Sequence, residues 1–143
     1  MASTATKHLR VSVITPVRTV LEQDAVSVVV PAYDGEWGIL PGHAPLMALL
    51  GCGRLVVADA EGKRQRVAIR GGFLQVSSGA VTVLTAEAAT AEEVDAAAVT
   101  QELRELKGKH PRLDADREAH EQKQDWANAR LKIISADANA GQN

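Results

Sequence analysis

The feature that most constrains the fold is an abrupt change in residue type near position 89. Residues 1–88 contain 17 of the 21 Val and Ile residues, and nine of the 11 glycines lie between Gly35 and Gly79. The later segment is rich in Ala, Glu, Gln, Lys and Arg. β-branched residues favour a pleated sheet, whereas alanine and straight-chain residues favour helix. The sequence therefore predicts an α+β protein, with a β domain over residues 1–88 and a helical domain over residues 89–143.

Short apolar runs separated by turn residues predict an antiparallel β-sandwich or barrel in the first half. A half-buried strand is expected at 9–13, where apolar and polar residues alternate. A second strand is expected at 26–30, and Pro31 is expected to end its ladder. Two hairpins are expected, with turns at 59–62 and 77–79. Their flanking strands are expected at 55–57, 66–69, 74–76 and 81–84.

The second half predicts two helices that form an antiparallel hairpin. A capping box, Thr90-Ala91-Glu92-Glu93, is expected to start the first helix, and Gly108 is expected to end it. Two series of apolar residues recur at helical spacing: Val94, Ala98, Val99, Leu103 and Leu106, then Ala115, Ala119, Trp126, Ala129 and Ile133. These stripes are thin and largely alanine, so we expect weak docking. The tail after Ser135 is expected to be flexible.

Composition excludes several classes of protein. A net charge of −2 argues against a protein that mainly binds nucleic acid. No apolar run approaches the roughly 18 residues of a membrane span, and no secretory signal is visible at the N-terminus. The histidines include no pair with metal-ligand spacing, and no phosphate-binding glycine motif occurs, so neither a metal nor a cofactor is expected.

The candidates for a catalytic pair are Cys52 and His43, nine residues apart. A small β-sandwich enzyme could use them as nucleophile and base, but a single cysteine flanked by small and apolar residues more often belongs to the core. The segment Gly51-Cys52-Gly53 predicts a turn before the strand at 55–57. We therefore expect no catalytic residues.

The segment 34–46 reads Asp-Gly-Glu-Trp-Gly-Ile-Leu-Pro-Gly-His-Ala-Pro-Leu. Gly38, Pro41, Gly42 and Pro45 restrict or permit particular backbone angles and so fix its path. Such a loop either presents a binding edge or turns a corner between sheets. A free-standing module that binds a ligand through the His43 loop is therefore a further alternative to an enzyme.

Residues 35–46 closely resemble the signature loop of the epsilon subunit of F-type ATP synthases. The opening strand at 8–15 is similar to that of the family, and so is the hairpin of 71–76 with 81–84. The order of a β domain and a helical hairpin also matches. The resemblance covers roughly residues 8–134.

The resemblance implies an N-terminal antiparallel β-sandwich, a C-terminal two-helix hairpin and a non-catalytic place in the central rotor. It implies that the subunit joins the gamma subunit to the membrane c-ring during proton-driven ATP synthesis. The hairpin would reach the catalytic alpha and beta subunits in an extended state that inhibits ATP hydrolysis. The location implied is peripheral, on the cytoplasmic face of the bacterial inner membrane.

The resemblance also assigns an interface. Glu36 would face the ring and His43 would lie nearer gamma. The expected interface residues are Glu36, Trp37, Gly38, Leu40, Pro41, Gly42, His43 and Pro45.

Two departures from the family pattern concern the helices. Some bacterial members bind ATP through an Ile/Leu-Asp-x-x-Arg-Ala segment, and here Asp95 is present while Ala98 replaces the arginine. Loss of that cation removes a charge-assisted hydrogen bond worth roughly 1.5–3 kcal/mol, so we expect poor ATP binding by this mode. Residues 112–134 carry five basic and five acidic groups, which argues against strong inhibition through an acidic surface.

Overall fold

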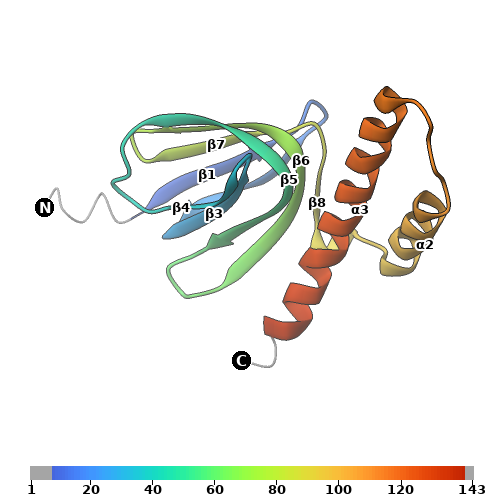
Figure 1. Ribbon diagram of the computed structural model, residues 1–143. Helices are drawn as coiled ribbons and strands as arrows, with labels where there is room; N and C mark the ends of the chain where they lie inside the picture. Colours follow the sequence, from blue (N-terminus) through green and yellow to red (C-terminus); the bar gives the residue numbers. More distant parts are fainter. Residues whose placement is uncertain (1–7, 141–143) are drawn as a thin grey trace, which may run out of the picture.

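The computed structural model describes residues 8–140, with side chains described up to Ile134. Eight strands precede a short 3₁₀ turn and two helices (Figure 1). The strands are β1 (Leu9–Ile14), β2 (Thr19–Ala25), β3 (Ser27–Ala32), β4 (Gly35–Ile39), β5 (Leu46–Ala58), β6 (Arg64–Ser77), β7 (Ala80–Leu84) and β8 (Ala88–Thr90). They are followed by η1 (Ala91–Glu93), α2 (Ala96–Lys107) and α3 (Asp114–Ala140). The predicted β-sandwich followed by two helices is confirmed.

The strands form a sheet ordered β2-β1-β7-β6-β5-β3-β4, and β8 pairs with β6 off this path. Strands β5 and β6 are 13 and 14 residues long and curve, so that the sheet folds over on itself (Figure 1). The pairing of β1 with β7 is parallel, and the other pairs are antiparallel. The expectation of a purely antiparallel sheet is therefore wrong for this one pair.

Aliphatic side chains fill the space between the two layers. Alternate residues of β1, β3, β5, β6 and β7 point inward and are almost completely buried, as the two-residue period of a strand requires. The predicted strand at 9–13 buries Leu9, Val11 and Val13 in this way.

Glycines allow the long strands to bend, and here two sequence predictions are wrong. Gly51 and Gly53 lie inside β5 instead of forming the predicted turn. Glycine is needed at position 53 because a Cβ there would come within 2.9 Å of Pro31 Cβ. Gly71 and Gly72 lie inside β6, which joins two predicted strands into one. Both have positive φ, and Gly72 passes so close to β7 that a Cβ would come within 1.9 Å of the Leu84 carbonyl oxygen.

Strand β3 continues through Pro31 to Ala32, beyond its predicted end. Its register with β5 shifts between Val29 and Ala32, and this irregularity accommodates a residue that has no N–H. The two predicted hairpin turns are confirmed: β5 and β6 are joined at 59–63, and β6 and β7 at Ser78 and Gly79, both with positive φ.

The first helix, α2, begins at Ala96, five residues later than the capping box at Thr90 predicted. Glu93 accepts hydrogen bonds from the Thr90 backbone N–H and hydroxyl, both at 3.0 Å, and this box closes only the turn η1. Asp95 then caps α2, its Oδ1 accepting from the N–H groups of Ala97 and Ala98. The predicted end at Gly108 is confirmed.

Helix α3 packs on β5 and β6, and α2 packs on α3 (Figure 1). Trp126, Ala129 and Ile133 lie against Ala68 of β6, whereas Ala115 and Ala119 are exposed, so the predicted stripe is wrong in the first turns of α3. The helix continues to Ala140, past the predicted start of a flexible tail, and residues 141–143 lie outside the described part of the chain.

Candidate interaction surface

The segment predicted as a constrained loop is partly a strand. Glu36, Trp37 and Gly38 lie on β4, which forms one edge of the sheet and pairs with β3. All three are exposed, and the single buried residue of β4 is Ile39. A strand at the edge leaves one row of backbone groups unpaired, and this row is accessible to a partner.

The remaining predicted residues form the connection from β4 to β5. The N–H of His43 donates to the Leu40 carbonyl at 3.1 Å, and its ring Nδ1 lies 2.8 Å from the Ala44 carbonyl oxygen. Gly42 has φ +87°, a conformation that favours glycine. Leu40 is 61 % exposed, and Pro41 and Pro45 flank the turn. The connection is thus a rigid turn that displays apolar and polar side chains.

The structure separates His43 from Cys52. Cys52 lies six residues along β5 from Leu46, about 20 Å at the rise of a strand. It packs in the cluster beneath α3 with Ala68 and Trp126. Burial raises the pKa of its thiol to about 11, and the nearby Asp125 carboxylate adds to that shift. A raised pKa keeps the sulfur protonated, which is the opposite of what a nucleophile requires.

An exposed apolar row crosses four strands on the outer face of the sheet. Leu49 pairs with Phe73, Phe73 pairs with Leu84, and Leu84 pairs with Ile14. Leu49, Phe73 and Leu84 are 55 %, 50 % and 51 % exposed, and Met47, next to the row on β5, is 71 % exposed. We call these five residues the apolar row. Large apolar side chains gathered on one outer face mark an interaction site in a soluble domain.

The apolar row is bordered by polar and then charged residues. Adjacent positions on the same face are Gln75, Thr82 and Ser12, and beyond them Arg10 pairs with Glu22 and Asp24 at 3.4 and 3.2 Å. The row also follows the turn at 40–45 directly along β5. Together the turn and the apolar row form a continuous surface with an apolar centre and a polar border, the usual anatomy of a protein interface.

Sequence reasoning missed the apolar row, although a signal exists. A half-buried strand alternates apolar and polar residues, but Leu49-Leu50, Phe73-Leu74 and Val83-Leu84 are consecutive apolar pairs. In each pair one member is buried and the other is exposed; the buried members are Leu50, Leu74 and Val83. Only the register of three strands shows that the exposed members are neighbours.

The helical hairpin is held by a second group of contacts. Arg130 on α3 donates through Nη2 to both carboxylate oxygens of Glu102 on α2, each at 2.9 Å. The same guanidinium lies 5.0 Å from the Trp126 ring centroid. At the base of the hairpin Glu93 forms an ion pair with Arg18 of the β1–β2 turn. The hydrogen bonds from Thr90 and the Arg18 cation lower the pKa of the Glu93 carboxyl.

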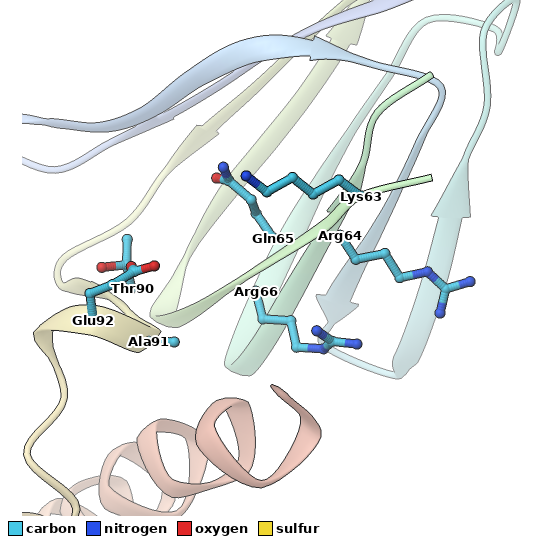
Figure 2. A pocket seen from close by; sticks show the side chains of 7 residues that line it. All are labelled: Lys63, Arg64, Gln65, Arg66, Thr90, Ala91 and Glu92. Carbon is cyan, nitrogen blue, oxygen red and sulfur yellow. The ribbon is translucent and has the colours of Figure 1, made fainter. Parts of the chain in front are cut away.

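The described surface has several hollows, and one of about 600 Å³ is lined by Cys52 together with Arg70 and Asp125. One of about 150 Å³ lies between the start of β6 and η1 and is lined by basic residues and Glu92 (Figure 2). Among the described residues no group of three or more His, Cys, Asp or Glu is placed to hold a metal ion. None of the described helices combines the length and apolar character needed to cross a membrane.

Comparisons with known proteins show the family to which this chain belongs. Residues 8–91 match the family model described as the delta/epsilon chain of ATP synthase, beta-sandwich domain. The ATP synthase epsilon chain of Synechococcus sp. is 41 % identical over 130 residues, covering 90 % of this chain and 93 % of that protein. The epsilon chain of Leptospira borgpetersenii is 39 % identical over 103 residues, covering 72 % of this chain and 80 % of that protein.

Solved structures lead to the same family. A chain in the Euglena gracilis mitochondrial ATP synthase, OSCP/F1/c-ring, superposes with a TM-score of 0.78 at 26 % identity, covering 88 % of this chain and 80 % of that one. A chain in the Tetrahymena thermophila central stalk/c-ring structure shares the fold, with a TM-score of 0.60 at 12 % identity over 88 % and 96 % of the two chains. The β-sandwich match over residues 8–91 and the long alignments with epsilon chains show that this chain belongs to the epsilon-chain family of ATP synthases.

Proposed function

We propose that this chain is a non-catalytic subunit of the central rotor of an F-type ATP synthase. In this role it links the gamma subunit to the membrane c-ring during proton-driven ATP synthesis. The observation that carries the proposal is the apolar row beside the turn at 40–45, on a chain whose relatives are epsilon chains. A surface with this anatomy is suited to stable assembly with another subunit and offers no site for chemistry.

We assign the two parts of this surface to two partners. The apolar row, whose members are in register across four strands, is the surface that packs against gamma. The edge strand β4 and the turn at 40–45 lie at the rotor interface, with Glu36 on the side of the c-ring and His43 nearer gamma. The two prolines restrict φ at two positions of this turn, and Gly42 supplies the positive φ that the turn needs, so the backbone path is well defined, as transmission of torque requires.

The helical hairpin supplies a candidate for regulation. Helix α2 packs on α3, and α3 packs on the sheet mainly through Trp126, Ala129 and Ile133. Because this contact is small, an extended state that reaches the catalytic alpha and beta subunits lies within a few kcal/mol. We propose that such a state slows ATP hydrolysis. The complex would hold the chain at the cytoplasmic face of the bacterial inner membrane.

Affinity purification of the tagged chain from its native membranes, followed by native mass spectrometry, tests the proposal. We expect gamma and the catalytic subunits to co-purify with it. Recovery of the chain alone, in mild detergent and low salt, would contradict a rotor role. Deletion of residues 90–143 is expected to raise ATP hydrolysis of the assembled complex, and unchanged hydrolysis would contradict the regulatory part alone.

A further inference from the structure

The tip of the helical hairpin contains a hollow that the proposed function does not use. It has a volume of about 440 Å³ and lies between the end of α2, the link of residues 108–113 and the first turns of α3. Small-molecule sites typically occupy roughly 300–1,000 Å³. Its lining residues are Lys107, Lys109, His110, Pro111, Arg117, His120, Glu121 and Gln124.

The hollow gathers positive charge from three separate segments. Lys107 ends α2, Lys109 lies in the link, and Arg117 comes from α3, whereas Glu121 is the single carboxylate in the lining. Among the residues whose side chains are described, no carboxylate lies within ion-pair distance of Lys107 or Lys109. The lining residues therefore carry a net charge of +2, from three cations and one carboxylate, and of these cations Arg117 alone has an ion-pair partner among the described side chains.

A hydrogen bond to the link orients the exposed side chain of Arg117. Its Nε donates to the Pro111 carbonyl at 3.1 Å, and its backbone N–H donates to the Leu113 carbonyl at 2.9 Å. Its one carboxylate neighbour, Asp114, is 3.8 Å away and fully exposed, so this pair is weak. A positioned guanidinium can present two parallel N–H donors to an oxyanion. The imidazoles of His110 and His120 and the Gln124 amide add further donors.

We infer that the tip hollow binds a small anion with several charges, of the polyphosphate class. Cations on three sides of one hollow favour a ligand with at least two linked phosphate groups over a single phosphate, since such a ligand can contact all three. The hollow lies at the far end of α2 from Asp95, about 18 Å along a 12-residue helix. It is therefore separate from the segment that resembles the ATP motif, and the inference goes beyond the proposed rotor function.

The hollow beside η1 provides a matched comparison. It too is basic, but the side chains of Lys63, just before β6, and Arg64, its first residue, point in opposite directions and do not converge (Figure 2). Its volume is about 150 Å³, and Glu92 lies at its border. Equal loss of charge at this second site leaves the tip intact, so it controls for long-range attraction between an anion and any basic surface.

The test is a titration of the full chain with inorganic pyrophosphate at pH 7 and low salt. Calorimetry measures the affinity, and NMR detects changes at the two histidine rings. We expect saturable binding at one site, with shifts of the His110 and His120 resonances. Lys107→Gln with Lys109→Gln, and separately Arg117→Gln, should weaken the affinity by about fivefold or more. Lys63→Gln with Arg64→Gln should change it by less than about twofold. Far-UV circular dichroism checks that each variant keeps its helices.

Three outcomes would overturn the inference. They are uptake that rises linearly without saturation, equal weakening in the tip variants and in the comparison variant, and binding of citrate as tight as that of pyrophosphate. The last would show a site for any polyanion and not for polyphosphate. None of them bears on assembly with gamma, which the purification experiment tests separately.

Discussion

Single residues determine where this sheet bends, and Gly72 is the clearest case. It has φ +119°, and a Cβ there would lie 1.9 Å from the Leu84 carbonyl oxygen. Because the obstacle is backbone of the neighbouring strand, Gly72→Ala should lower the free energy of unfolding by about 3 kcal/mol or more. Gly38→Ala is the matched control, since nothing lies within 4 Å of its Cβ position, and should change it by less than about 0.5 kcal/mol. Urea denaturation measures both, and a Gly72 variant as stable as the control would contradict the model of the bend.

The thiol of Cys52 offers a chemical test at the same scale. Its pKa of about 11 means that little thiolate exists at pH 8, and α3 covers the residue. We expect iodoacetamide to alkylate the native chain at least about tenfold more slowly than the urea-unfolded chain. Mass spectrometry of timed samples gives both rates. Equal rates would contradict a protected thiol and would favour the enzyme alternative based on Cys52.

Glu93 couples the base of the hairpin to pH. Its pKa in the folded state is lowered, so the stability it contributes is present at neutral pH and is lost as the pH falls below 4.5 and through the folded-state value. Glu93→Gln should therefore lower stability at pH 7 by about 0.5–1 kcal/mol and by less at pH 3, because the contribution of the wild-type carboxylate declines once the pH is below 4.5. Thermal unfolding at the two pH values makes the comparison. A variant with an equal deficit at both would show that the carboxylate charge is not involved.

At the scale of elements, docking of the helical hairpin depends on a few contacts of α3. Ile133 is completely buried against the cluster around Ala68, whereas Leu113 in the link is 68 % exposed. Ile133→Ala should destabilise the docked helix by about 2–4 kcal/mol, and Leu113→Ala by much less. Fluorescence of Trp126 in a Trp37→Phe background reports the docking. Equal effects of the two substitutions would mean that α3 is held elsewhere.

The start of α2 bears on nucleotide binding. Asp95 Oδ1 accepts hydrogen bonds from the N–H groups of Ala97 and Ala98 at 3.1 and 3.2 Å, so this carboxylate is occupied in capping the helix. Together with alanine at 98, this predicts no micromolar binding of ATP to the isolated chain. Calorimetry with ATP tests it. Weak binding that Lys107→Gln with Lys109→Gln removes belongs to the tip hollow, whereas micromolar affinity that survives in that variant would contradict the prediction.

Elements differ in how well the sequence predicts them. Alternation at 9–13 and the turn residues at 62 and 79 are local signals, and the structure confirms them. The glycines at 51, 53, 71 and 72 look like turns in the sequence, because a close approach of another strand leaves no local trace. Strand β4 was predicted as a loop for the same reason. Its glycines and tryptophan suggest irregular structure, whereas its pairing with β3 depends on the tertiary fold.

The surface was partly predictable. The resemblance of residues 35–46 to the epsilon signature indicated this segment as an interface loop; its strand β4 was not predicted, and its role at an interface stays a prediction. The apolar row could not be located, because its members come from β1, β5, β6 and β7 and meet only through strand register. The helix stripe was wrong for a related reason: Ala115 and Ala119 have helical spacing, but both are exposed, and the contact with Ala68 of β6 is made by Trp126, Ala129 and Ile133.

At the scale of the whole molecule, we propose that the turn at 40–45 and the apolar row act as one assembly surface. Gly42 has φ +87° and open space around its Cβ position, so Gly42→Val strains the turn and little else. Assembly with gamma should weaken by about tenfold while the far hairpins stay folded. Binding of gamma at unchanged affinity would show that this turn lies outside the interface.

The most direct test of the rotor role is the affinity of the chain for purified gamma subunit, measured for wild type and two variants. Phe73→Glu places a charge in the centre of the apolar row, and Gln75→Glu places the same charge two residues along the same outer face of β6. We predict a one-to-one complex for wild type, a loss of affinity of about a hundredfold or more for Phe73→Glu, and at most about a fivefold loss for Gln75→Glu. Absence of a complex with wild type, or equal affinities for all three proteins, would contradict the account.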